Sequence, residues 1–463
     1  MAVKQSTSNV IAKSASGEGD FLGHPKGLYV LFFTEMWERM SYYGMRVLLV
    51  LYMTSYLFAS PEIGEGVIGL AALKGIFGDI GAQPMASQIY GLYTGLVYFT
   101  PVFGGIIADR WLGQRNTVIV GGILMAIGHF LMAFETLFFV ALFFLVLGNG
   151  AFKPNISTQV GGLYAPGDSR RDGAFTLFYM GINLGALIAP FVCGTLGQKA
   201  GWHYGFGAAG VGMLIGLCVY IFGQKYIRPH PENVKNTLKE AAKGEKIPFT
   251  ATEKKAIWAL VVLCALNIVF WCVYEQQGNT MQLFADTQIE WPYIFGWQIP
   301  STWFQSFNPF FILLFAPLLN IFWKWQAKSG KEPTSVTKMA LGCVFLAAAF
   351  GIMILAAQAV GMGRGTVLWL VATTLVLTIG ELYLSPIGLS LVTKVAPARI
   401  VSMMMGMWFL SSFFGNYLSG YVGSFYETMS RESFFTLMVV LSLGAAIAMA
   451  AFNKPLKKAL GGL

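Results

Sequence analysis

The chain is short of charge. Lys, Arg, Asp and Glu make up 11% of its 463 residues, whereas apolar residues make up 56%. A soluble protein is roughly 25% charged, because a fold of this length has a large surface to cover. The composition therefore excludes a soluble enzyme, a disordered chain and a nucleic-acid-binding domain, despite a formal net charge of +9.

Cysteine and histidine are also scarce. No C-x-x-C pair occurs, and every cysteine lies inside an apolar run, which favours buried thiols over a disulfide framework or a metal site. The residues are Cys193, Cys218, Cys264, Cys272 and Cys343, with histidines at His24, His129, His203 and His230. The histidines are scattered, mostly near the ends of apolar runs, so no catalytic or metal constellation is expected, and neither is a cofactor.

Long apolar runs dominate what is present. About 20 such residues cross a bilayer as a helix, and the alternation typical of a β-barrel is not seen. The sequence therefore predicts an all-α membrane protein with twelve transmembrane helices. The predicted spans are 27–56, 84–109, 114–134, 136–164, 171–198, 203–227, 254–286, 299–326, 335–361, 365–395, 399–428 and 432–455.

The distribution of basic residues predicts the orientation. Residues 1–26 are polar and lack the apolar core of a secretory signal, which indicates a cytoplasmic tail. With the N-terminus inside, only Lys74, Lys199, Arg364 and Arg431 fall in outer segments. This bias predicts that both ends are cytoplasmic, and it explains the basic net charge without a nucleic acid.

One long hydrophilic segment divides the spans. Residues 228–253 form a predicted cytoplasmic linker between six-helix bundles at 27–227 and 254–455, and 456–463 form a second tail. Two six-helix bundles around a central cavity are the layout of the major facilitator fold. The longest outer loop, 56–83, is expected to contain a short helix.

The first span contains several ionisable residues. A charge at the bilayer centre costs at least about 3 kcal/mol, so such side chains face water or a partner. At about 100° per residue, one stripe holds Glu35, Glu38, Arg39, Tyr42 and Arg46. The stripe predicts a functional face, although a static cluster built on the favourable Glu35–Arg39 spacing is an alternative.

Three further charges stand alone in their spans. Lys153 lies in the first half, and Glu275 and Glu381 lie in the second. With Arg46, they offer opposite charges that can pair between the halves, as gates or as static staples. A carboxylate that loses its partner in a low-dielectric cavity takes up a proton more readily, so such pairs couple protonation to conformation.

These residues carry a family resemblance. FFTEMWERMSYYGMR resembles the E-x-x-E-R signature of the proton-dependent oligopeptide transporters of the major facilitator superfamily, with Met40 replacing the usual Phe. Seven more segments match in family order between about residues 25 and 455. They are YFTPVFGGIIADRWLGQR, GNGAFKPNIS, FTLFYMGINLGA, FWCVYEQQG, FQSFNPFF, GELYLSP and MGMWFLSS.

Two departures from the family pattern matter. Many bacterial members carry two extra helices between the sixth and seventh spans, but 228–255 is too short for them, so twelve helices are expected. Mammalian members carry a histidine in the second span where this chain has Gly91. Proton handling is therefore expected to rest on carboxylates.

The resemblance implies a substrate site for a zwitterionic peptide. It places Arg39, Lys153 and Tyr43 near the peptide carboxylate, and Glu381 near the amino group. Tyrosines and tryptophans line the cavity, although most aromatic residues in such a chain serve packing. The remaining expected substrate contacts are Tyr42, Tyr98, Asn183, Trp271, Asn308, Ser385 and Trp408.

The resemblance also implies the proton-coupling groups. Glu35 and Glu38 couple to Arg39, and Glu275 pairs with Arg46 and releases it when protonated. The expected protein is a monomeric, proton-coupled symporter in the bacterial inner membrane. Its expected partners are di- and tripeptides, peptide-like drugs, protons and membrane lipid.

Other functions remain open at this point. Fold does not fix the ligand, so transport of nitrate, a drug or another small solute is an alternative. Keeping Glu381 beside a pair of cations favours a zwitterion over an anion. A membrane enzyme lacks a catalytic constellation, a channel leaves the pairs between halves unexplained, and a receptor role stays open.

Overall fold

The computed structural model describes residues 20–78, 80–165, 167–230, 250–361, 363–397 and 400–459. Most of the predicted N-terminal tail (1–26) and of the predicted linker (228–253) lies outside the described residues, as does the end of the predicted C-terminal tail (456–463).

The first half of the chain is helical throughout its membrane runs. A short hairpin of β1 (Asp20–Phe21) and β2 (His24–Pro25) precedes it. Its helices are α2 (Lys26–Tyr52), η1 (Met53–Leu57), α3 (Pro61–Glu65), α4 (Leu70–Phe77), α5 (Ala82–Phe99), α6 (Pro101–Ile107), η2 (Ala108–Leu112), α7 (Gly113–Leu131), η3 (Glu135–Leu137), α8 (Phe138–Gly162), α9 (Arg171–Ala189), η4 (Pro190–Gly194), α10 (Thr195–Lys199), α11 (Trp202–Gly223) and η5 (Gln224–Tyr226).

The second half of the chain is likewise helical in its membrane runs. Its helices are α13 (Ala251–Tyr274), η6 (Glu275–Gly278), α14 (Thr280–Thr287), η7 (Ser301–Ser306), α15 (Phe307–Lys328), α16 (Ser335–Val360), α17 (Leu368–Val395), α18 (Val401–Gly423) and α19 (Arg431–Ala459). Its loops hold the two-residue strands β3 (Ile289–Glu290), β4 (Tyr293–Ile294), β5 (Trp297–Gln298) and β6 (Gly365–Thr366). β3 pairs in parallel with β6, and β4 pairs antiparallel with β5.

Twelve transmembrane helices are present in the described residues, as predicted. Nine continuous helical runs are long and apolar enough to cross a membrane, and the run Ala82–Leu131 contains two crossings. The others are α2, which carries the charged stripe, and α18, which is rich in Gly, Ser and other small or polar residues. α4 lies inside the predicted outer loop, where a short helix was expected.

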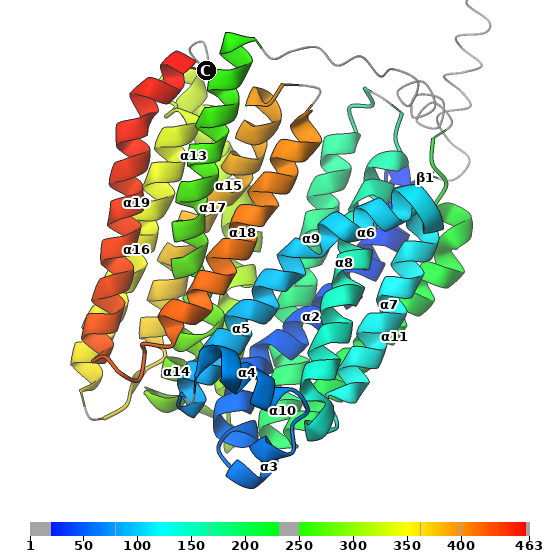
Figure 1. The fold of residues 1–463 in the computed structure, drawn as a ribbon. Coiled ribbons are helices and arrows are strands. Elements are labelled where there is room, and N and C mark those ends of the chain that lie inside the picture. The colour runs from blue at the N-terminus through cyan, green and yellow to red at the C-terminus, as the bar shows by residue number, and fades with distance from the viewer. Residues whose placement is uncertain are drawn as a thin grey trace, which may run out of the picture.

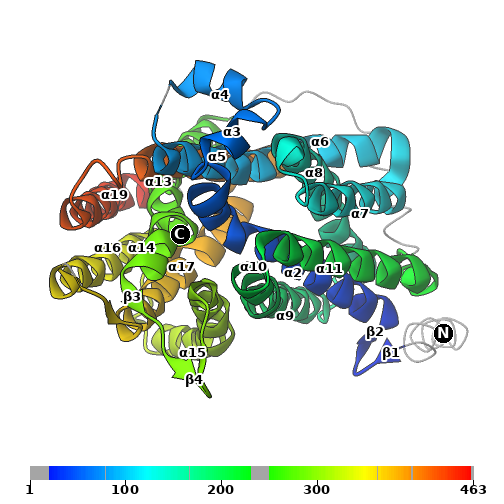
Figure 2. The ribbon, with the colours of Figure 1, turned by 90° about the horizontal axis from the view of Figure 1, so that it is seen from below.

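The helices form two groups. In the first, α2 packs on α9 and α11, and α7 packs on α8 and α11. In the second, α16 packs on α17 and α19, and α13 packs on α18 and α19. The groups meet where α5 lies along α18 and α9 approaches α15, and both groups are visible end-on in Figure 2.

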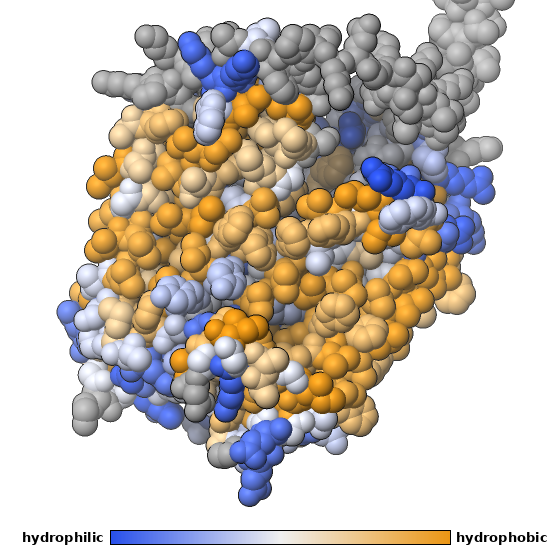
Figure 3. All heavy atoms as spheres, in the orientation of Figure 1, coloured by the Kyte–Doolittle hydropathy of each residue, from blue (hydrophilic) through white to orange (hydrophobic). Residues whose placement is uncertain are grey.

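The two ends of the molecule differ. β1 and the end of α19 lie toward the top of Figure 1, so the described chain ends share one side, here named the terminal side. The short helices α3, α4, α10 and α14 lie on the opposite side, here named the outer side (Figure 1). A broad apolar band separates polar ends in Figure 3, which is the surface expected of a helical bundle in lipid.

Candidate functional site

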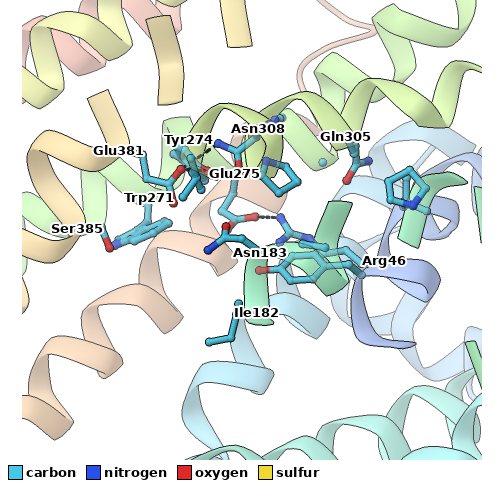
Figure 4. Close-up of a pocket in the computed structure, with 18 of the residues that line it drawn as sticks. Arg46, Ile182, Asn183, Trp271, Tyr274, Glu275, Gln305, Asn308, Glu381 and Ser385 are labelled. Atoms are coloured by element: carbon cyan, nitrogen blue, oxygen red, sulfur yellow. Dashed lines mark hydrogen bonds and ion pairs between the residues drawn. The ribbon is translucent and has the colours of Figure 1, made fainter. Parts of the chain in front are cut away.

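A cavity of about 200 Å³ lies between the two halves (Figure 4). Its lining combines aromatic, amide and charged side chains from both halves. The lining residues are Tyr43, Arg46, Val47, Tyr98, Tyr179, Ile182, Asn183, Ala186, Pro190, Trp271, Tyr274, Glu275, Gln277, Gly278, Gln305, Asn308, Pro309, Ile312, Glu381 and Ser385.

The charged stripe of α2 forms a buried cluster next to this cavity. The Arg39 side chain donates to the Glu38 carboxylate, including an Nη2–Oε1 bond of 2.8 Å, and its Nε lies 3.0 Å from Glu35 Oε1. Asn149 of α8 donates to Glu38 at 3.2 Å. All three charged residues are at most 3% exposed. One guanidinium therefore serves two carboxylates inside a single helix.

Two glycines of α9 bring its backbone against α2 at this cluster. A Cβ at Gly185 would lie 2.9 Å from Arg39 Cβ, and one at Gly181 would lie 2.9 Å from the Phe32 ring. Both distances are shorter than real Cβ contacts, so a larger residue would push the helices apart. Small residues permit close helix approach in membranes, and here they let α9 pack directly against α2 beside the charged residues.

A second ionic group on α2 crosses to the other half. The Arg46 guanidinium donates to the Glu275 carboxylate and, at 2.8 Å, to the Tyr90 hydroxyl. Glu275 begins η6, where the helical run from α13 to α14 changes to a 3-10 turn. The break points this carboxylate into the interface between the halves, so the predicted Arg46–Glu275 pair forms.

Glu381 of α17 has a different environment. Its Oε2 accepts from the Tyr274 hydroxyl at 2.7 Å and from the Asn308 amide at 2.9 Å. Thr378 fixes the same amide at 3.0 Å. The donors are neutral and belong to the same half, so the carboxylate faces the cavity without a cation in its bonds.

Lys153 departs from the expected pairing. Its Nζ lies 4.3 Å from the centroid of the Tyr98 ring, a cation–π distance. Within the described chain, no carboxylate lies within salt-bridge distance of this ammonium. The two carboxylates expected to pair across the halves have other partners: Arg46 holds Glu275, and neutral donors hold Glu381.

The cavity gathers seven of the eleven expected substrate contacts. They are Tyr43, Tyr98, Asn183, Trp271, Asn308, Glu381 and Ser385. Arg39, Tyr42 and Lys153 lie outside its lining, in the α2 cluster or beside Tyr98. Trp408 is 4% exposed and packs against Gly388 of α17, also outside the lining.

Several lining residues were not predicted. Tyr274 and Gln277 flank Glu275 within FWCVYEQQG, and Gln305 lies within FQSFNPFF. Their positions in these family segments were the available signal for including them. Tyr179 precedes Asn183 by one helical turn and accepts its amide at the backbone carbonyl, at 3.0 Å. In the described part of the chain, no cluster of three metal-ligating side chains occurs.

The outer side of the interface is closed by hydrogen bonds between the halves. The Gln198 amide of α10 donates to Asp286 at 3.0 Å and to Ser301 at 2.9 Å, while its carbonyl accepts from Thr302 at 3.0 and 3.1 Å. Besides the Arg46–Glu275 pair, four other hydrogen bonds also join the two halves. They connect Ser87 to Asn279, Gln83 to the Gly423 carbonyl, Trp303 to Thr195, and Ser306 to the Leu187 carbonyl.

Gly91 lies at the centre of the contact between α5 and α18. A Cβ at this position would lie 2.5 Å from the Gly420 backbone and 2.8 Å from the Asn416 carbonyl. A histidine side chain, which the family pattern places here in mammalian members, does not fit in this arrangement. The departure seen in the sequence therefore has a packing reason.

The fold and cavity define a class: an all-helical membrane transporter with its site between two bundles. The POT family (PTR2) model matches residues 115–250 and 246–438. The chain is 36% identical to a peptide transporter of Yersinia enterocolitica, over 94% of each chain. It is 34% identical to a di-/tripeptide transporter of Lactococcus lactis subsp. cremoris, over 96% of this chain and 98% of the relative.

A solved structure is similar over the same length. The crystal structure of a peptide transporter POT in complex with sulfate superposes with a TM-score of 0.82 at 32% identity, covering 96% of this chain and 98% of that one. This chain belongs to the POT family of major facilitator transporters. It is a multi-pass membrane transporter and not an enzyme.

Proposed function

We propose that this protein imports di- and tripeptides together with protons by alternating access. The family and the relatives named as peptide transporters support the substrate class. The bonds that close the outer side support a transporter held in one of its two access states. The two halves, 27–227 and 254–455, are proposed to rock as units around the cavity.

The charge arrangement of the cavity carries the proposal. Glu381 faces the cavity from the second half with neutral donors only, whereas Arg46 lines it from the first half. Two further cations of the first half, Arg39 and Lys153, lie next to this lining, and Lys153 stacks on the lining residue Tyr98. A zwitterionic peptide has its ammonium and carboxylate at opposite ends, so it matches such a dipolar site. We assign the amino group to Glu381 and Asn308, and the carboxylate to the side of Lys153 and Arg39.

The rest of the lining fits a ligand of variable side chain. Tyr43, Tyr98 and Trp271 provide apolar area with polar tips, and Ile182 and Ile312 add apolar walls. Such surfaces contact many side chains without selecting one. Asn183 adds an amide that can bind the peptide backbone.

Two carboxylate groups are proposed to carry the protons. Protonating Glu35 or Glu38 weakens its hold on Arg39 and frees the guanidinium for the substrate carboxylate. Protonating Glu275 releases Arg46, so the pair between the halves opens. Substrate and proton are thereby linked through shared cations.

The bacterial relatives support the proposed cellular setting. We propose a monomer in a bacterial cytoplasmic membrane, with both chain ends inside. A relative of this fold was solved in complex with alafosfalin, so peptide-like drugs are further candidate substrates for this chain.

The test is uptake of a labelled dipeptide into proteoliposomes with an inward proton gradient and membrane potential. Wild type is expected to accumulate the peptide, with competition from di- and tripeptides and none from free amino acids. Glu381→Gln is expected to lose binding. Glu38→Gln is expected to lose gradient-driven accumulation while retaining counterflow.

The matched control is Glu62→Gln, which neutralises an exposed carboxylate in α3 and should transport as wild type. Nitrate and single amino acids serve as alternative solutes in the same vesicles. Accumulation of one of these without any peptide uptake, by a wild type shown to be folded, would overturn the peptide assignment.

A further inference from the structure

A second cavity, of about 680 Å³, lies on the terminal side of the first half. It is enclosed by the beginning of α7, the end of α8 and the segment that follows α11. The His230 N–H donates to the Gly162 carbonyl at 2.8 Å, which ties that segment to α8. The lining residues are Gln114, Arg115, Gln159, Gly162, Leu163, Gln224, Lys225, Ile227, Arg228 and Pro229.

The lining is cationic. Arg115, Lys225 and Arg228 contribute three positive charges, and the lining contains no Asp or Glu. The nearby carboxylate of Asp168 is engaged by Arg170 at 2.8 Å. Within the described part of the chain, no carboxylate forms an ion pair with any of the three cations.

Neutral polar side chains also line this cavity. Gln159 is 9% exposed, and its amide exchanges hydrogen bonds with the buried Tyr220 hydroxyl at 2.8 and 2.9 Å. Gln114 and Gln224 add carboxamides near the rim. Leu163 and Ile227 supply an apolar wall beside the cations. A ligand here therefore meets positive charge, amide donors and an apolar flank together.

Exposed aromatic residues mark the depth of this cavity in the membrane. Trp111, Phe222 and Tyr226 are 73%, 78% and 43% exposed and lie in η2, α11 and η5, next to the lining residues in sequence. The Lys225 Nζ lies 5.0 Å from the Tyr226 ring centroid. Exposed Trp and Tyr residues gather at the level of lipid headgroups, so the cavity opens at that level.

We propose that this cavity binds the phosphate of an anionic phospholipid from the leaflet on the terminal side. Arg115 and Arg228 match phosphate oxygens in bidentate fashion, and Lys225 adds a third cation. Leu163 and Ile227 contact the glycerol and the first acyl carbons. Basic pockets between membrane helices on the cytoplasmic side are suited to such headgroups. The inference is independent of the transported substrate.

The experiment measures lipid retained by the full chain after delipidation in detergent, by native mass spectrometry. Phosphatidylglycerol and phosphatidylcholine of equal chain length are titrated separately. Inorganic phosphate is then added as competitor. The variant Arg115→Gln/Lys225→Gln/Arg228→Gln removes the cavity cations. The matched control, Lys324→Gln/Lys328→Gln/Lys331→Gln, removes three exposed cations from the end of α15 and the loop that follows it.

Wild type is expected to retain one phosphatidylglycerol more tightly than phosphatidylcholine. The cavity variant is expected to bind it at least about tenfold more weakly, whereas the α15 control keeps wild-type affinity. The single variants Arg115→Gln and Arg228→Gln should each give part of the loss if the triple variant fails to fold.

Three results would overturn the proposal. One is equal affinity for the two lipids, and another is an equal loss in both triple variants, which indicates diffuse surface attraction. The third is retention of inorganic phosphate together with full displacement of the lipid by millimolar phosphate. That result would assign the cavity to a free anion.

Discussion

α2 carries two buried ionic groups that differ in how they are built. Glu35, Glu38 and Arg39 satisfy one another within a single helix, whereas Arg46 reaches Glu275 in the other half of the protein. A rigid-body movement of the halves leaves the first group intact and separates the second. The same helix therefore carries an ionic cluster that is complete within it and an ion pair between the bundles, Arg46–Glu275, which we name the lock.

The energetic consequence is similar for both groups when one partner is lost. Removing one member of a buried pair leaves an uncompensated charge and costs about 3–5 kcal/mol. Arg39 has two dependent carboxylates, whereas Arg46 has one. The expected effects below therefore decrease from the cluster, through the lock and a neutral crosslink, to an exposed pair.

Arg39→Gln is expected to have the largest effect. It leaves Glu35 and Glu38 buried without their guanidinium, so we expect uptake at background level. The apparent thermal unfolding midpoint in detergent should fall by an amount corresponding to about 3–5 kcal/mol.

Glu35→Gln/Glu38→Gln/Arg39→Gln is the matched control for this first prediction. It removes all three charges and should recover much of the stability without recovering transport. Wild-type uptake by Arg39→Gln would show that the cluster is only structural.

Glu275→Gln is expected to open the lock. Arg46 would lose its charge partner and keep only neutral contacts such as Tyr90, so the outer side should open more often, by about 3 kcal/mol or on the order of 100-fold. The measurement is the labelling rate of Ala186→Cys, which lines the cavity, by an impermeant maleimide from the outer side. The labelling is measured in variants from which the native cysteines have been removed.

The charge exchange Arg46→Glu/Glu275→Arg should return labelling toward the wild-type rate. If the exchange labels as fast as Glu275→Gln, the pair does not act as the lock, and the closing force lies in the other bonds between the halves.

Gln198→Ala tests a neutral crosslink at the same outer side. It removes bonds to Asp286, Ser301 and Thr302, each with a net contribution of about 1 kcal/mol that water partly replaces at the rim. We expect labelling of Ala186→Cys to rise by about tenfold, less than for Glu275→Gln. Gln358→Ala, an exposed position on α16, should leave the rate unchanged.

The partly exposed pair Asp168–Arg170, at the surface of the terminal side, gives the smallest expected effect. Hydrogen bonds from the Arg170 side chain and backbone lower the pKa of Asp168 below its usual value. A lowered folded-state pKa stabilises the protein above the unfolded pKa of about 3.9, and this contribution is lost as the pH falls through the folded value. Asp168→Asn should cost only about 0.5 kcal/mol at pH 7, because solvent screens the pair.

The measurement is the difference in unfolding midpoint between wild type and Asp168→Asn as a function of pH. The difference should be constant from pH 7 to about pH 5 and should shrink below about pH 4. A difference at pH 7 as large as that of Arg39→Gln would contradict the ranking of buried over exposed pairs.

Much of the fold follows from local sequence. Apolar runs of bilayer length predict the twelve helices, and the 3.6-residue period places Glu35, Glu38 and Arg39 on one stripe. The pairing of Lys153 was not predictable in this way. It depends on which carboxylates other donors already hold, as Tyr274 and Asn308 hold Glu381.

The lining of the cavity was likewise predictable from the sequence only in part. Motif segments contain most of its polar lining, Tyr179 and Gln305 included, but which of their side chains face the cavity depends on how α9 approaches α15 and η7. The basic cavity at the terminal side was also invisible in the sequence, because Arg115 and Arg228 are far apart along the chain.

The sequence by itself determined the membrane class, the helices and the presence of costly charges, because lipid forces each span to satisfy its backbone internally and makes every buried charge conspicuous. Only the tertiary structure decided which charges pair, since pairing depends on distances between helices remote in sequence. Arg46 of α2 meets Glu275 at the start of η6, where the helical run of α13 changes to a 3-10 turn. Gly91 lies against Gly420 because the backbones of α5 and α18 are in contact there. Helix period fixes a face, but packing selects the partner that this face meets.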